Sequence, residues 1–193
     1  MTLNLLLLGP QGAGKGTQAK RIAAEYSLPH IATGDMLRAA IANGSQLGRR
    51  VKPLVEAGRL VPDDLVVGLI RERLDGSDAA DGFILDGFPR TLGQARALDE
   101  MLGDIGRDLT VVFEFQLSDE TAVQRLLRRA QEEGRPDDEP EAIRTRLALY
   151  REQTEPLVEH YRTTGNLVGI HAERSINEVY AEIQQALERV VTA

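Results

Sequence analysis

A glycine-rich run between an apolar segment and a helical segment is the most informative chemical feature of the chain. It extends over residues 9–17, with Gly9, Gly14 and Lys15 at the spacing of a phosphate-binding loop, and it follows the apolar segment 3–8 directly. A strand that leads through glycines into a helix leaves unpaired backbone N–H groups at the helix N-terminus, where the helix dipole also favours anions. The run predicts a cradle for nucleotide phosphates. The alternative is a plain glycine-rich turn.

Two further positions concern a metal ion. Phosphate-binding loops usually place Ser or Thr directly after the lysine, but here Gly16 intervenes before Thr17. Because that hydroxyl normally binds Mg²⁺, we expect nucleotide phosphates and waters to hold the ion here. Asp86 ends the apolar segment 83–85 and is predicted to bind Mg²⁺ through water, with a strand-terminating Asx turn as the alternative.

Arginine dominates the basic residues of the chain. Of the 23 basic residues only Lys15, Lys20 and Lys52 are lysines, so 20 are arginines. A guanidinium group forms a planar fork that binds phosphate with two hydrogen bonds. Candidate anion-binding arginines lie in four regions of the chain: Arg38, Arg90, Arg125 with Arg128 and Arg129, and Arg135 with Arg144 and Arg146. For the last two regions the alternative is a solvated face paired with nearby acidic residues: Glu132, Glu133, Asp137 and Asp138.

Length, charge and composition exclude several classes of protein. A chain of 193 residues with 42% hydrophobic residues can bury one core, which favours a single α/β domain. The net charge of −7 argues against nucleic acid and anionic membranes as partners. No cysteine is present, which excludes disulfides and cysteine-bound zinc. The apolar segment 3–8 is too short to span a membrane, so we expect a cytoplasmic protein.

Apolar runs alternate with amphipathic segments along the chain. The predicted strands are 3–8, 30–32, 83–85, 109–117 and 167–170. The predicted helices are 15–25, 63–74, 92–102, 119–131, 140–161 and 175–191. Continuous apolar runs suit strands that are buried on both faces, and alternation with helices predicts a five-stranded parallel sheet with helices on both faces. Ligands of such sheets bind at the carboxyl ends of the strands.

Two stretches depart from this alternation. Residues 33–61 contain two helical segments around an Asn-Gly-Ser break and no strand, which predicts a small helical insert. Residues 130–139 are polar and contain Gly134 and Pro136, which predicts a surface loop.

Taken together, these motifs closely resemble those of the adenylate kinase family. The resemblance extends over nearly the whole chain and rests on the following segments: 9–18, 33–38, 58–63, 82–91 with Gln94, 125–129 and 134–138. It implies one kinase domain over residues 1–193, of the P-loop NTPase type. Residues 33–61 would be the insert that binds the nucleoside monophosphate, and residues 126–138 would be a lid of the short type, without zinc.

The resemblance also implies roles for individual residues. Residues that would bind ATP are Gly12, Ala13, Gly14, Lys15, Gly16, Thr17, Arg125, Arg129 and Arg174. Residues that would bind AMP are Thr33, Arg38, Arg59, Leu60, Val61, Gly87, Phe88, Pro89, Arg90, Gln94, Arg135 and Arg146. Those that would act on the transferred phosphoryl group are Lys15, Arg90, Arg129, Arg135 and Arg146. Mg²⁺ would accompany ATP, near Asp86.

The expected reaction converts ATP and AMP into two ADP, reversibly and with Mg²⁺. Relatives that use UMP and CMP tend to have alanine at the position of Thr33 and asparagine at that of Thr91, so AMP is favoured and a UMP/CMP kinase is the alternative. A GTP-dependent switch is disfavoured because the chain has no Asn-Lys-x-Asp motif, and a non-catalytic nucleotide-binding module is disfavoured by the full set of arginines. We expect a monomer.

Overall fold

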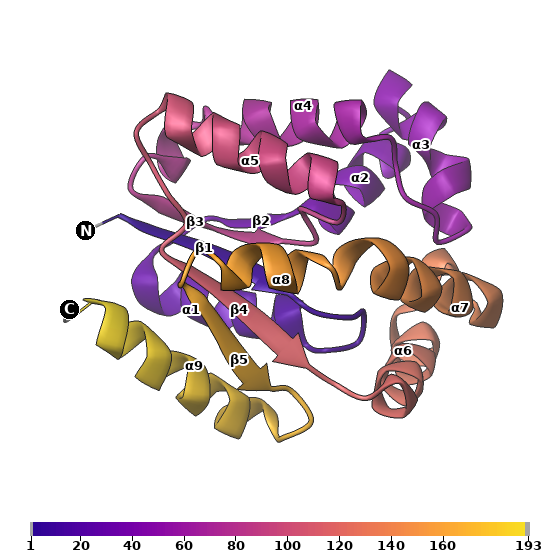
Figure 1. The fold of residues 1–193 in the computed structure, drawn as a ribbon. Helices are drawn as coiled ribbons and strands as arrows, with labels where there is room; N and C mark the ends of the chain where they lie inside the picture. Colours follow the sequence, from indigo (N-terminus) through magenta and orange to yellow (C-terminus); the bar gives the residue numbers. More distant parts are fainter. Residues whose placement is uncertain (1, 192–193) are drawn as a thin grey trace.

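The computed structural model describes residues 2–191. The prediction of one domain over 1–193 includes Met1 and residues 192–193, which lie outside the described residues. Within the described part, five parallel strands form one sheet in the order β2-β3-β1-β4-β5 (Figure 1). The strands are β1 Leu3–Leu8, β2 His30–Ala32, β3 Gly82–Asp86, β4 Val111–Gln116 and β5 Leu167–His171. The predicted five-stranded parallel sheet is confirmed.

Helices cover both faces of this sheet, as predicted. The α-helices are α1 Lys15–Tyr26, α2 Thr33–Ala42, α3 Gln46–Glu56, α4 Asp63–Leu74, α5 Leu92–Asp104, α6 Asp119–Glu133, α7 Pro140–Leu149, α8 Leu157–Arg162 and α9 Ile176–Val191. Two short 3₁₀ turns, η1 Ser77–Ala79 and η2 Pro136–Asp138, and the π-helical turn η3 Tyr150–Thr154 complete the described elements. Among them, no helix has the length and apolarity needed to cross a membrane.

Strand β1 shows why the sheet is covered on both sides. Leu6 and Leu8 pack into the core formed with α4, α5 and α8, whereas Leu5 and Leu7 pack into the core formed with α1 and α9. Successive side chains of a strand point to opposite faces, so a strand with apolar side chains on both faces needs helices on both. The phosphate-binding loop therefore follows a strand at the centre of the molecule.

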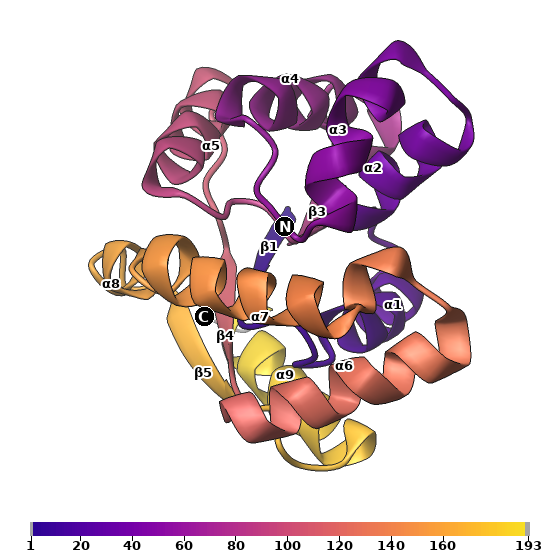
Figure 2. The ribbon, with the colours of Figure 1, turned by 90° about the vertical axis from the view of Figure 1, so that its right-hand side faces the viewer.

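The prediction of a single helix over 140–161 was wrong. Helix α7 ends at Leu149, the turn η3 follows, and α8 begins after Pro156. Pro156 has no backbone N–H and its ring crowds the carbonyl one turn earlier, so the regular α-helical hydrogen bonding is interrupted before α8. In Figure 2, helices α2 and α3 lie above α7.

The prediction of a surface loop over 130–139 was also wrong. Helix α6 continues to Glu133 and ends at Gly134, which has a φ of 60°. In the turn η2, Asp137 is 5% exposed and Asp138 is fully buried. Charged side chains are buried only with partners, and these two carboxylates contact arginines of neighbouring helices.

Candidate functional site

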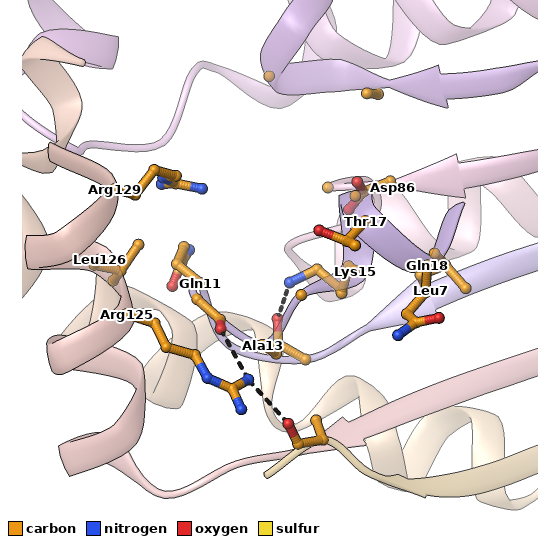
Figure 3. A pocket seen from close by; sticks show the side chains of 18 of the residues that line it. Leu7, Gln11, Ala13, Lys15, Thr17, Gln18, Asp86, Arg125, Leu126 and Arg129 are labelled. Carbon is orange, nitrogen blue, oxygen red and sulfur yellow. Dashed lines mark hydrogen bonds between the residues drawn. The ribbon is translucent and has the colours of Figure 1, made fainter. Parts of the chain in front are cut away.

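A cavity of about 650 Å³ opens at the carboxyl ends of the strands. Its wall is formed by the glycine-rich loop, the end of β3, helix α6 and the loop after β5 (Figure 3). This is the edge at which ligands of open parallel sheets bind. The cavity is therefore the candidate nucleotide site.

The glycine-rich loop has the conformation that the sequence predicts. Helix α1 begins at Lys15, and Gly14 before it provides no side-chain cap, so the first N–H groups of the helix remain available to an anion. Gly12 has a φ of +84°, and a Cβ atom there would lie 2.8 Å from the backbone oxygen of Ala122 in α6. Only glycine allows α6 to pack so closely on the loop.

Lys15 is folded back onto its own loop. Its Nζ donates hydrogen bonds to the backbone oxygens of Gly9, at 2.7 Å, and Pro10, at 2.8 Å. Burial lowers the pKa of Lys15 to about 8; Asp86 opposes this shift, while the charges of Arg90 and the other nearby arginines add to it. The ammonium group is thus bound to backbone carbonyls of the loop and not to a carboxylate, so it is available to a phosphate.

Asp86 lies opposite Lys15 at the end of β3. Burial acts to raise the pKa of Asp86, but the hydrogen bond from His30, at 3.3 Å, and the charge of Lys15 outweigh it and lower the pKa. No group of three or more His, Asp or Glu residues that could hold a metal occurs in residues 2–191. A single ionised carboxylate beside a phosphate cradle fits Mg²⁺, which keeps most of its waters and shares phosphate oxygens.

The two buried aspartates of η2 bring three arginines together. Asp138 accepts hydrogen bonds from Arg129 Nε and Nη2, at 2.6 and 2.7 Å, and from Arg146 Nη1, at 2.8 Å. Asp137 lies 3.2 Å from Arg146 Nη1 and 3.7 Å from Arg38 Nη1. The pKa of Asp138 is lowered because the bonds and charge of Arg129, with that of Arg146, outweigh the burial that would raise it.

The alternative of a solvated basic face holds only for the outer arginines. Arg128, which is 79% exposed, pairs with Glu132 at 2.7 Å on the surface, whereas Arg135, which is 26% exposed, pairs with Glu133 at 2.5 Å and also lines the large cavity. An exposed pair such as that of Arg128 contributes little to stability. The inner arginines of the same region point to the cavity instead.

Arg125 joins helix α6 to the loop after β5. Its Nη1 donates to the backbone oxygen of Ala172 at 2.9 Å and lies 3.5 Å from that of Gly12 (Figure 3). Arg174 lines the same cavity and lies 3.9 Å from Glu182. Both arginines are thus at the end of the cavity formed by β5 and α6.

A second, smaller cavity adjoins the first. Apolar side chains of α2, α3 and α4 line it, together with Thr33 and Gln94, which are both buried. Within residues 2–191, the hydroxyl of Thr33 has no hydrogen-bond partner. Arg38, Arg90 and Arg146 line both cavities. An apolar pocket with a few polar groups at one end and cations at its mouth suits a nucleotide whose base enters first.

The structure brings nearly all the predicted site residues to these two cavities. All those predicted to bind ATP line the large cavity: Gly12, Ala13, Gly14, Lys15, Gly16, Thr17, Arg125, Arg129 and Arg174. Most of those predicted to bind AMP line the small one: Thr33, Arg38, Arg59, Leu60, Val61, Gly87, Arg90, Gln94 and Arg146. Pro89 and Arg135 line the large cavity only. The side chain of Phe88 lines neither, because it is 1% exposed and packs in the core.

Sequence reasoning missed several residues of the two cavities. Gln11 and Ile176 line the large cavity, and Leu37 and Val66 line the small one, without any sequence signal beyond their position beside a motif. His30 was assigned only to a strand. It is the first residue of β2 and pairs with Ile84 of β3, two residues before Asp86, and no motif in the sequence marks it.

Comparisons with known proteins agree with this geometry. The sequence model of the family described as adenylate kinase matches residues 7–166. The chain is 49% identical over 186 residues to the adenylate kinase of Maricaulis maris (strain MCS10), covering 96% of this chain and 99% of that protein. It is 48% identical over 188 residues to that of Caulobacter vibrioides (strain NA1000 / CB15N), covering 97% and 98%. It is 46% identical over 186 residues to that of Stenotrophomonas maltophilia (strain R551-3), covering 96% and 100%.

Proposed function

The chain belongs to the adenylate kinase family, and from this premise we propose that its two adjoining cavities hold ATP and AMP end to end. The reaction is the reversible transfer of a phosphoryl group from ATP to AMP, which yields two ADP. The relatives named adenylate kinase favour this reading over a UMP/CMP kinase. One observation carries the proposal for the site: cations from five separate segments line the large cavity, namely Lys15, Arg38, Arg90, Arg129 and Arg146, and three of them, Arg38, Arg90 and Arg146, also line the small one.

The large cavity is the proposed ATP site. The N–H groups of residues 12–17 would bind the phosphates, and Lys15 would leave its loop carbonyls to bridge to the transferred group. Arg125 and Arg174 would lie beside the adenine. Arg129, Arg135 and Arg146 would surround the transferred phosphoryl group.

The small cavity is the proposed AMP site. Arg38 and Arg90 would bind the phosphate at its mouth, while Thr33, Val61 and Gln94 would line the base. Arg59, Leu60, Gly87, Phe88 and Pro89 complete the proposed set, Phe88 acting from the core behind the pocket.

Phosphoryl transfer here needs positioning and positive charge more than covalent help. An ionised oxygen of AMP attacks the terminal phosphorus of ATP, and the bond from that phosphorus to the bridging oxygen breaks. No general base is required, because the attacking oxygen already carries its charge. Lys15 and the arginines would stabilise the charge that spreads over the three equatorial oxygens.

Mg²⁺ is the proposed metal of the reaction. When bound, it would neutralise negative charge on the ATP phosphates. Asp86 would hold it through water, and the pKa of Asp86, lowered by its neighbours despite burial, keeps the carboxylate ionised for that task.

Water competes with AMP as acceptor, so the site must close before the reaction. We assign closure to residues 33–61 as the AMP-binding insert and 126–138 as the lid. The contact of Arg38 in α2 with Asp137 in η2, at 3.7 Å, supports this assignment because it joins the two segments across the mouth of the cavity. Monomeric action in the cytoplasm completes the proposal.

A coupled assay tests the proposed function. With ATP and Mg²⁺, the purified protein should form ADP with AMP as acceptor far faster than with CMP, UMP or GMP. It should also convert ADP alone into ATP and AMP. Failure of both reactions would overturn the proposal, and equal rates with CMP and AMP would overturn the choice of acceptor.

A further inference from the structure

Both ends of the Gln94 amide are already engaged. In the first turn of α5, its Oε1 accepts a hydrogen bond from the backbone N–H of Arg90 at 2.7 Å. Its Nε2 donates to Asp63 Oδ1, also at 2.7 Å, across 31 residues of sequence. Gln94 is 2% exposed and lines the small cavity. Its orientation is therefore set by the backbone of Arg90 and by Asp63, which does not line the cavity.

Asp63 is seated closely on the start of α5. Its Oδ2 accepts a hydrogen bond from Thr91 Oγ1 at 2.9 Å, and the same Thr91 oxygen caps α5 by accepting from the N–H of Gln94 at 3.1 Å. A Cβ atom at Gly93 would lie 2.9 Å from Asp63 Oδ2. Glycine at 93 thus makes room for the carboxylate, whose two oxygens are bound by the N-cap residue of α5, Thr91, and by Gln94 in its first turn.

A carboxylate in this place allows one amide orientation only. An ionised carboxylate accepts hydrogen bonds and cannot donate them. If the Gln94 amide were reversed, its oxygen would face the carboxylate of Asp63 and its NH₂ group would face the N–H of Arg90. Both contacts would then be repulsive. Asp63 and Arg90 thereby fix the positions of the two groups of the Gln94 amide that remain free, one N–H donor and one oxygen lone pair.

A fixed donor and a fixed acceptor on Gln94 distinguish bases by the arrangement of the hydrogen-bonding groups on the base. Adenine has an acceptor nitrogen, N1, beside an exocyclic amino donor. Hypoxanthine has the reverse, a donor N1–H beside a carbonyl acceptor. The other uncharged polar side chain among the described residues that line this pocket, Thr33, has a hydroxyl that can donate or accept, so it fits either base. Only a group with a fixed donor and acceptor order can reject the reversed pattern.

We propose that Asp63 is a positioning residue that sets the base specificity of the monophosphate site by fixing the orientation of the Gln94 amide. This inference rests on the proposed function, since it requires that the small cavity hold the base of the acceptor. Asp63 itself does not line that cavity, and it acts through Gln94.

The test compares AMP with inosine monophosphate as ligands of wild-type protein and of Asp63→Asn. Asparagine keeps the shape of the side chain, but it can donate as well as accept, so position 63 no longer opposes the reversed amide and only the N–H of Arg90 still does. The ratio of the dissociation constants of inosine monophosphate and AMP should fall about tenfold, the effect of one hydrogen bond to a charged group. The KM for ATP and the kcat with AMP should change less than about twofold, because the phosphate-binding groups are untouched.

Asp64→Asn is the matched control. Asp64 is also in the first turn of α4 and is exposed, and within residues 2–191 its side chain has no hydrogen bond or ion pair. The Asp64→Asn substitution removes the same charge at the same helix end, so this variant should keep the wild-type ratio of the two dissociation constants. If Asp63→Asn lowers the Tm by more than about 5 °C, Asp63→Ser, whose hydroxyl can also donate as well as accept, takes its place with the same expectation.

Two results would overturn the proposal: an unchanged ratio in the Asp63 variant, or an equal fall in the Asp64 control. Either of these results can be distinguished from a failure of the proposed function. A wild-type protein that binds AMP and forms no ADP contradicts the function. Wild-type activity together with an unchanged ratio contradicts only the role of Asp63.

Discussion

At the residue scale, the proton on Lys15 links pH to nucleotide binding. Burial lowers the pKa of Lys15 to about 8, so about half of the side chains are neutral at pH 8. A bound triphosphate favours the charged form and raises this pKa. ATP binding at pH 8 should therefore take up about half a proton, and affinity should fall as the pH rises from 7 to 9. Calorimetry in two buffers of different ionisation enthalpy measures the uptake.

Lys15→Arg provides the control for this measurement. Arginine stays charged throughout the same pH range, so the uptake assigned to position 15 should vanish while ATP still binds. The phosphates of ATP do not obscure the result, because their last pKa, near 6, lies well below pH 8. An uptake that persists in this variant would place the proton on another group.

At the element scale, the turn η2 is held by its two aspartates in place of an apolar core. Asp138 is fully buried and joins α6 to α7 through Arg129 and Arg146. Asp138→Ala would leave both arginines without this partner, and loss of one partner of a buried ion pair costs about 3 kcal/mol. Denaturant unfolding should show a decrease of that size in the free energy of unfolding.

The neighbouring exposed residue gives the comparison for this element. Glu139→Ala should change the free energy of unfolding by less than about 0.5 kcal/mol, as is usual for surface substitutions. Equal, small effects of the two substitutions would show that η2 is held by other contacts.

At the scale of the whole molecule, the insert and the lid are expected to separate in solution without nucleotide. The contact of Arg38 with Asp137 is a 3.7 Å ion pair with one partly exposed partner, which is weak. Small-angle scattering of the free protein should therefore give a larger radius of gyration than the described coordinates. An analogue that joins both nucleotides through one phosphate chain should reduce it. A free protein that already matches the coordinates and does not change would contradict closure.

Local sequence determined the elements that hold the phosphates. The apolar run of β1, the glycines after it and the helix that begins at Lys15 are adjacent in the chain, so their conformations follow from short-range sterics and hydrogen bonding. The mostly apolar strands also determined a parallel sheet with two covered faces. The arginines were recognisable as phosphate ligands from their chemistry and from the resemblance to a family.

Only the tertiary structure decided which charged residues are buried and which face solvent. Asp137 and Asp138 look like solvated loop residues in a polar stretch, but arginines of α6 and α7 make their burial favourable. The hydrogen bond of Asp63 to Gln94 joins two helices that are separated by the strand β3. Such contacts depend on how distant elements pack, and no periodicity or spacing along the chain encodes them. The environment of a charged group depends on residues that are distant in the sequence, whereas the conformation of a loop depends mainly on neighbouring residues.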